Sequence, residues 1–245
     1  LLDQIIEEKS LKAKAVVGFY PANAVNRDDI LVKQDDDSEI LFNCLRQQSS
    51  KRAGEPNSSI ADYIAPLDTG RQDYIGFFAL TAGIGIEKLI RVYEEQHDDY
   101  HIIMVKALAD RLAEAFAERM HERVRKEFWG YAYDESYDNE ALIAEKYQGI
   151  RPAPGYPACP DHTEKRKLFK LLNVEQSIGL SLTENLAMYP ASSISGYYFS
   201  HPSSRYFGIG KIGKDQVEIY SKRKGQSIAE TEQWLAQNLS YNPSS

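Results

Sequence analysis

The sequence predicts an α+β fold, a single domain in which a mainly antiparallel, twisted sheet is flanked by helices, one of them long. Two apolar segments, 30–33 and 39–42, are joined by the polar turn 34–38 with no helix between them, which predicts antiparallel pairing. Strand-like and helix-like segments also come in blocks rather than in strict alternation. This order favours an α+β fold over a doubly wound parallel sheet.

The first third of the chain supplies most of the predicted strands. A helix is expected at residues 1–9, where apolar residues recur four positions apart. Residues 15–20 (AVVGFY) predict a buried strand that Pro21 stops. Residues 49–59 form a polar, exposed loop. Residues 73–80 (DYIGFFAL) are apolar nearly throughout, so they predict the strongest strand of the chain, buried on both faces.

The rest of the chain is mostly helical. Helices are expected at residues 86–96 and, as one long helix, at residues 98–128. An apolar residue at every fourth position predicts the core-facing seam of the long helix: Met104, Leu108, Leu112, Phe116 and Met120. The remaining predicted elements are a short helix capped by Asn139, a helix at 165–172 behind the capping-box-like residues 161–164, a strand pair at 193–200 and 206–212, and helices at 214–224 and 228–239.

Composition excludes several classes of protein. The 245 residues include 29 basic and 36 acidic side chains, and the resulting charge of −7 argues against a nucleic-acid surface. The hydrophobic share of 42% and the charged share of 27% are ordinary for a globular protein. Neither a transmembrane helix nor a signal peptide is expected. Because the first residue is Leu1 rather than Met, we expect a piece of a longer protein.

Cysteine and histidine usage predicts neither a disulfide framework nor a metal centre. Cys44 and Cys159 are far apart in the sequence and are expected to be reduced thiols of a cytoplasmic protein. The chain has no C-x-x-C pair of the kind that structural zinc sites use. His97 and His101 have helical i, i+4 spacing, but the H-E-x-x-H pattern and a third ligand are missing.

Two glycine patterns suggest alternative functions. Residues 208–213 (GIGKIG) match the G-x-G-x-x-G pattern of nicotinamide-dependent oxidoreductases, with Glu230 near the ribose-contact offset. The chain after Gly213 is predicted to be helical and polar, so the second strand of a βαβ unit is missing. Residues 81–85 (TAGIG) lie where a stand-alone S-adenosylmethionine methyltransferase has its glycine loop, but the later alternation of strands and helices is absent. Ordinary turns are the simpler interpretation of both patterns.

The proline-rich segment 151–160 (RPAPGYPACP) is the least common feature of the chain. Four prolines predict a stiff, extended strip whose free N–H donors are few: those of Ala153, Gly155, Tyr156, Ala158 and Cys159. Arg151 offers a planar fork for a carboxylate, Gly155 permits close backbone approach, and Tyr156 offers an aromatic face. The strip therefore suits a flat, zwitterionic ligand. A rigid connector or a protein-interaction module is the alternative.

The residues around this segment resemble a known family. The sequence RPAPGYPACPDHTEK, with HDDYHIIMVKALADRLAEAFAERMHERVRKEFWGYA before it and SGYYFSHPSSRYF after it, is similar to the C-terminal activation domain of cobalamin-dependent methionine synthase. The resemblance runs from residues 16–18 to residues 234–236. It implies that residues 1–245 form one activation domain that lacks the N-terminal part of the family domain.

The resemblance also implies a function. Domains of this family bind S-adenosylmethionine and restore cobalamin after its accidental oxidation, in a reductive methylation that belongs to methionine biosynthesis. The cobalamin is held by another domain of the same polypeptide, and flavodoxin or a flavoprotein reductase supplies an electron. The domain is part of an enzyme but has no catalytic nucleophile or metal of its own. Basic residues within 119–126 or 222–224 are candidates for the contact with the electron donor.

Site residues follow from the same resemblance, position by position. Seven residues are expected to contact S-adenosylmethionine: Arg151, Ala153, Gly155, Tyr156, Tyr206, Phe207 and Glu114. Arg151 would bind the ligand carboxylate, and Glu114 would attract its cationic groups. Asp110 is expected to contact the cobalamin-bearing domain, whereas Glu118 and His121 are expected to form a solvated edge of the long helix.

Overall fold

The computed structural model describes residues 1–243, which group into two compact units. Residues 1–18, 77–133 and 168–195 form the first unit, and residues 19–76, 134–167 and 196 onward form the second. Three strands contribute residues to both units: β1 (Lys12–Val25), β4 (Asp73–Ile84) and β7 (Ser193–Tyr198). Within the described residues, no helix is both long and apolar enough to span a membrane.

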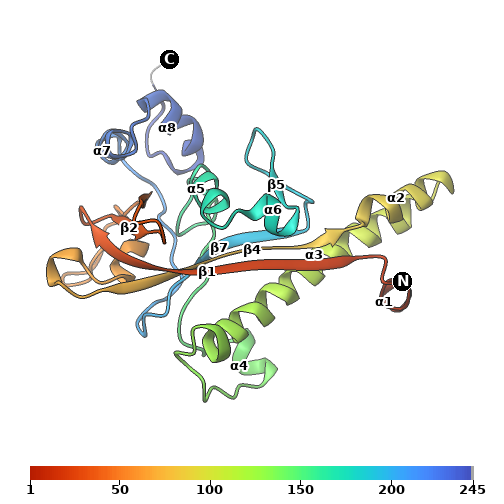
Figure 1. Ribbon diagram of the computed structural model, residues 1–245. Helices are drawn as coiled ribbons and strands as arrows, with labels where there is room; N and C mark the ends of the chain where they lie inside the picture. The colour runs from red at the N-terminus through yellow and green to blue at the C-terminus, as the bar shows by residue number, and fades with distance from the viewer. Residues whose placement is uncertain (244–245) are drawn as a thin grey trace. The chain divides into compact units, whose positions relative to one another are not determined.

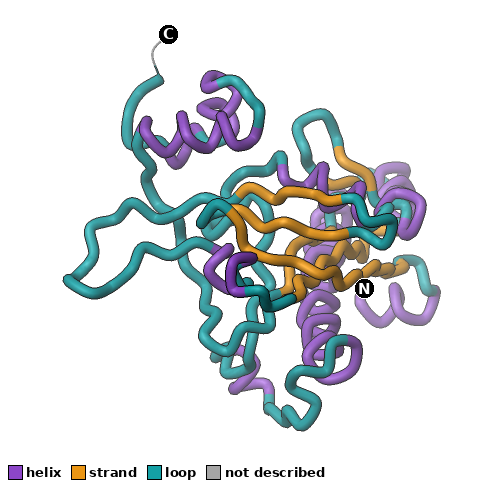
Figure 2. Tube along the Cα trace, turned by 60° about the vertical axis from the view of Figure 1, so that its left-hand side comes forward, coloured by secondary structure: helices purple, strands orange, loops and turns teal. Residues whose placement is uncertain are grey.

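The main sheet has five strands in the order β3-β2-β1-β4-β7 (Figures 1 and 2). Strands β2 (Asp29–Lys33) and β3 (Glu39–Asn43) pair in antiparallel fashion, as their short polar turn predicted. Strand β1 pairs with β2 from Ala22, opposite Val32, to Val25, opposite Asp29. Two further short strands, β5 (Ser181–Leu182) and β6 (Met188–Tyr189), form a separate pair. The predicted α+β class is confirmed.

Strand β1 is longer than predicted. The sequence placed its end at Pro21, but the strand continues to Val25. The fixed φ of proline is compatible with extended backbone, and the ladder with β2 begins only at Ala22, so the missing N–H of Pro21 removes no bond from it. Strand β4 meets the prediction, because its residues from Ile75 to Gly83 are all buried.

Helices α1 (Leu2–Glu8), α2 (Ile86–Glu95) and α3 (Asp99–Arg123) belong to the first unit, and the last of them continues as a π-helical turn over Val124–Phe128. These elements confirm the predicted helices at 1–9, 86–96 and 98–128. Helices α2 and α3 lie side by side (Figure 1). Ile5 of α1 packs with Leu89 of α2 and Val105 of α3 in one apolar cluster.

The predicted seam of α3 is displaced by one residue. Of the five apolar residues assigned to it, only Met120 is buried, and the other four are half-buried. The buried line consists of smaller residues and ends in a histidine: Val105, Ala109, Ala113, Ala117 and His121. Small side chains allow a helix to lie close to its neighbours, whereas the larger ones flank the contact. A hydrophobic stripe in the sequence favours the larger residues, because it reflects hydrophobicity rather than size.

The second unit contains α4 (Asn139–Ile143), α7 (Lys214–Lys224), α8 (Ile228–Trp234) and the first residues of α5 (Glu164–Leu171), while α6 (Val174–Ile178) lies in the first unit. Short 3₁₀ turns cover Ile60–Tyr63, Leu67–Thr69 and Ala236–Asn238. Asp138, rather than the predicted Asn139, caps α4, because its carboxylate accepts from the amide of Ala141 at 2.8 Å.

Residues 206–212, predicted as a strand, form an irregular segment instead. Ile209 and Ile212, the buried residues of this segment, are three positions apart, and they pack with Val217 of α7 and Leu235 in one apolar cluster. The amide of Ile209 donates to the carbonyl of Pro157 at 2.8 Å. The segment therefore connects the proline-rich loop to the C-terminal helices, and β7 has no hairpin partner there.

Candidate ligand-binding site

The proline-rich segment is a folded loop rather than the predicted extended strip. The amide of Gly155 donates to the carbonyl of Cys159 at 2.8 Å, and the amide of Cys159 donates to the carbonyl of Tyr156 at 3.0 Å. The amide of Tyr156 in turn donates to the carbonyl of Ala153 at 3.1 Å. Gly155 permits this reversal because its φ is +94°, a conformation that other residues rarely adopt. Three of the five predicted donors are thus used inside the loop.

The start of the loop is fixed to the end of β7 and the residue after it. Ile150 and Phe199 exchange both backbone hydrogen bonds, at 3.1 and 3.0 Å. The amide of Tyr197 donates to the carbonyl of Pro152 at 2.9 Å. Arg151 lies between these contacts, so its backbone position is determined by the sheet.

Arg151 and Tyr206, both expected from the sequence to contact the ligand, are joined by a hydrogen bond. The backbone amide of Arg151 donates to the hydroxyl oxygen of Tyr206 at 3.0 Å, and Nη1 of Arg151 donates to the hydroxyl oxygen of Tyr147 at 3.2 Å. Tyr206 is 39% exposed, and burial raises the pKa of its hydroxyl to about 12 although Arg151 acts in the opposite direction. Arg151 is itself half-buried. The two residues form the fixed edge of the candidate site.

We expect Tyr206→Phe to lower the free energy of unfolding by about 1 kcal/mol, because the amide of Arg151 loses its acceptor. Urea unfolding followed by circular dichroism measures this change. Tyr156→Phe is the matched control, since the Tyr156 side chain is exposed and its loss of a hydroxyl should change the free energy by less than about 0.5 kcal/mol. Equal effects of the two substitutions would contradict the assigned hydrogen bond.

The other predicted residues of the loop region differ in exposure. Tyr156 is 60% exposed, so its ring face is accessible to a ligand. Ala153 and Gly155 are half-buried. Phe207 packs against the apolar cluster of the C-terminal helices, with its ring edge-on to Tyr63 at 6.4 Å between centroids. This packing gives Phe207 a structural role in the second unit, whatever it contributes to binding.

Glu114 lies in the first unit, whereas the other six predicted site residues lie in the second. It is exposed on α3. On the same helix, the carboxylate of Asp110 accepts from the hydroxyl of Ser192 at 2.6 Å. His121 is fully buried, so the predicted solvated edge of the helix is wrong at this position. The reason is its spacing, because His121 follows Ala117 by four residues and continues the buried line.

The histidines and cysteines singled out in the sequence lie in separate places. His97 has a φ of +56° and lies between α2 and α3, while Nδ1 of His101 is 2.7 Å from a carboxylate oxygen of Asp98. Within residues 1–243, no group of three or more acidic, histidine or cysteine side chains could hold a metal ion. Cys44 and Cys159 are not in a disulfide, and burial raises the pKa of both thiols. Neither thiol is therefore activated as a nucleophile.

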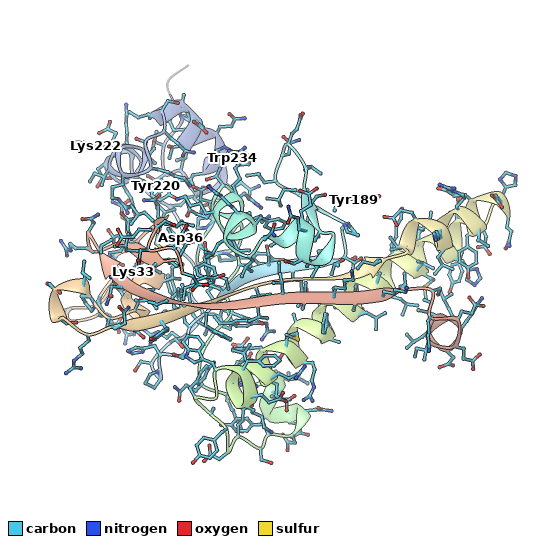
Figure 3. All side chains as sticks on the ribbon, viewed as in Figure 1. Lys33, Asp36, Tyr189, Tyr220, Lys222 and Trp234 are labelled. Carbon is cyan, nitrogen blue, oxygen red and sulfur yellow. The ribbon has the colours of Figure 1, made fainter. Side chains whose placement is uncertain are left out.

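The basic segment 222–224 is not the exposed patch that the sequence suggested. Lys222 is exposed on α7 (Figure 3), but Arg223 pairs with the buried carboxylate of Asp29. Lys224 is 5% exposed and pairs with Asp161 and Glu164. In the segment 119–126, Arg125 is likewise fully buried. Sequence pattern could not reveal the ion pairs of Lys224, because more than fifty residues separate it from each partner.

Comparisons with known proteins show which family and which solved structure the chain is similar to. Residues 1–225 match the family model described as "Vitamin B12 dependent methionine synthase, activation domain". Among solved structures, the chain is similar to one described as "Crystal Structure of the MetH Reactivation Domain bound to AdoHcy", with 54% sequence identity and a TM-score of 0.94. The match covers 98% of this chain and 74% of that one.

Proposed function

Since this chain belongs to the family of activation domains of vitamin B12-dependent methionine synthase, we propose that it binds S-adenosylmethionine, and the demethylated product AdoHcy, on the loop 151–160 with Tyr206. The observation that carries the proposal is the likeness to a reactivation domain bound to AdoHcy, at 54% identity over 98% of this chain. The geometry adds that Arg151 and Tyr206 are already held together by a hydrogen bond.

The residues of the second unit fit the chemistry of such a ligand. S-adenosylmethionine carries an α-carboxylate, two cationic centres and a flat adenine ring. The guanidinium of Arg151 matches the carboxylate in charge and in planar geometry. The exposed ring of Tyr156 and the partly exposed ring of Tyr206 offer faces to a sulfonium cation or to adenine. Glu114, in the first unit, stays a separate prediction that rests on the family resemblance.

We further propose that residues 1–245 act as one activation domain in reductive methylation. The ligand, when bound, supplies the methyl group that restores cobalamin held by another domain of the same polypeptide. The role of this chain is to bind and orient the methyl donor, and flavodoxin or a flavoprotein reductase supplies the electron. Asp110, exposed on α3, is the proposed contact with the cobalamin-bearing domain.

Arg151→Ala should weaken the binding of AdoHcy roughly tenfold to a hundredfold, because a charge-assisted contact is worth about 1.5–3 kcal/mol. Isothermal titration calorimetry of the chain with AdoHcy measures this loss. Arg166→Ala is the matched control, since Arg166 is an exposed arginine of α5 in the same unit and its loss should leave the affinity unchanged. NADH is titrated in parallel and should give no binding heat.

Two results would count against the proposal. The first is an absence of binding heat with AdoHcy in the unmodified chain. The second is an Arg151→Ala effect of less than twofold, which would mean that this side chain serves only the fold. Binding of NADH that Gly210→Ala abolishes would instead support the oxidoreductase alternative.

A further inference from the structure

The side chain of His162, which the sequence did not indicate as a site residue, packs against Gly155 of the loop 151–160. A β-carbon built on Gly155 would lie 2.2 Å from Cε1, 2.5 Å from Nδ1 and 2.6 Å from Nε2 of His162. Three ring atoms at such similar distances mean that the imidazole presents its face to Gly155. Glycine therefore suits position 155 for two reasons. It leaves room for this ring, and it adopts the positive φ of the turn.

The ring of His162 is fixed in turn by Lys165. The Nζ atom of Lys165 lies 2.9 Å from Nδ1 of His162, and Lys165 is 7% exposed. Burial lowers the pKa of His162, and the nearby cation of Lys165 lowers it further, against the opposing effect of Asp161. Both effects favour the neutral imidazole, whose Nδ1 is placed to accept a hydrogen bond from the ammonium group of Lys165. Residue 162 is thus a flat ring held in one orientation.

We propose that His162 is a positioning residue for ligand binding, whose ring holds residues 153–159 in the folded shape that presents Arg151 and Tyr156. The effect of His162 on ligand affinity rests on the proposed function, namely that this loop binds AdoHcy. The hydrogen bonds of the amides of Gly155 and Cys159 close the loop, and the ring packs directly against it. Without the ring, Gly155 gains conformational freedom that ligand binding must then remove, so affinity falls.

Three substitutions separate the two contacts of His162. His162→Ala removes both the ring face and the acceptor. His162→Phe keeps a flat ring against Gly155 but has no acceptor for Lys165, and His162→Asn keeps an acceptor near the position of Nδ1 but has no ring. We expect His162→Ala and His162→Asn to weaken AdoHcy binding about three- to tenfold, and His162→Phe to restore most of the loss.

Amide hydrogen exchange supplies a measurement that does not need the ligand. In His162→Ala, the amides of Gly155 and Cys159 should exchange at least about tenfold faster, while the amide of Ile150, which is bonded to the carbonyl of Phe199, should be unaffected. The inference is overturned if these two amides keep their exchange rates in His162→Ala. It is also overturned if His162→Ala binds AdoHcy as tightly as the unmodified chain does. A third contrary result is tight binding of AdoHcy by His162→Asn together with weak binding by His162→Phe. A chain that binds no AdoHcy would remove the proposed function, and exchange alone would then decide whether His162 holds the loop.

Discussion

Lys224→Met is expected to lower the free energy of unfolding by about 3–5 kcal/mol, because it leaves the buried carboxylate of Asp161 without its cation. The side chain of Lys224 is 5% exposed and pairs with Asp161 and, at 2.7 Å, with Glu164. Both acidic residues are almost fully buried. Lys167, the second cation near Glu164, lies 3.0 Å away and remains half-exposed to solvent. Methionine fills a similar volume, so the loss reports charge rather than packing.

The pH dependence of the Lys224→Met effect follows from Asp161. Burial on its own would raise the pKa of this carboxyl, but Lys224 and hydrogen bonds from Thr163 and Tyr220 hold the pKa below its usual value. Stability from a lowered carboxyl pKa is present above about pH 4 and is lost as the pH falls through the folded value. In Lys224→Met, the unpaired Asp161 takes up a proton at a higher pH than in the unmodified chain. The difference in stability between the two should therefore be largest at neutral pH and shrink as the pH falls, first through protonation of Asp161 in the variant and then in the unmodified chain.

The matched control for Lys224→Met is Lys222→Met, on the same helix and exposed (Figure 3). It should change the free energy of unfolding by less than about 0.5 kcal/mol. Urea unfolding at pH 7 and near pH 3 measures both variants. A loss below 1 kcal/mol for Lys224→Met at pH 7, or a loss that does not diminish in acid, would show that the ion pairs do not carry this stability.

Local patterns predicted the elements that depend on neighbouring residues. The polar turn between β2 and β3, the continuous apolar run of β4 and the helix at 214–224 were all predicted from nearby residues and are confirmed. The predictions failed where packing with distant segments decides the conformation. Residues 206–212 pack among the C-terminal helices instead of pairing with β7, and the seam of α3 consists of alanines that no hydrophobic stripe reveals.

The candidate site shows the same limit. Sequence identified Arg151 and Tyr206, which are 55 positions apart, only through resemblance to a family, and the structure places them within one hydrogen bond. The folded shape of the proline-rich loop was missed because prolines fix φ locally, whereas one glycine with positive φ and three internal hydrogen bonds reverse the chain. The contact of the His162 ring with Gly155 was not predicted. It depends on the missing side chain of glycine, and no sequence pattern indicates such a contact.

The second large effect concerns Gly85, the last residue of the glycine pattern at 81–85. Gly85 has a φ of +97°, and a β-carbon there would lie 2.6 Å from the backbone carbonyl oxygen of Ser10. Its own carbonyl accepts from the amide of Lys88 at 3.1 Å as α2 begins. A backbone atom cannot rotate away as a side chain can. We therefore expect Gly85→Ala to cost about 2–5 kcal/mol, the sum of backbone strain and steric overlap.

Gly130→Ala distinguishes the two parts of this cost. Gly130 lies in the same unit and has a φ of +72°, but no heavy atom lies within 4 Å of a β-carbon built there. Its substitution should cost only the conformational part, about 1 kcal/mol. Thermal and urea unfolding of the two variants measures the difference. If Gly85→Ala were no worse than Gly130→Ala, close approach to Ser10 would not explain the glycine. A loss of S-adenosylmethionine binding in a fully stable Gly85→Ala chain would instead make residues 81–85 a ligand loop.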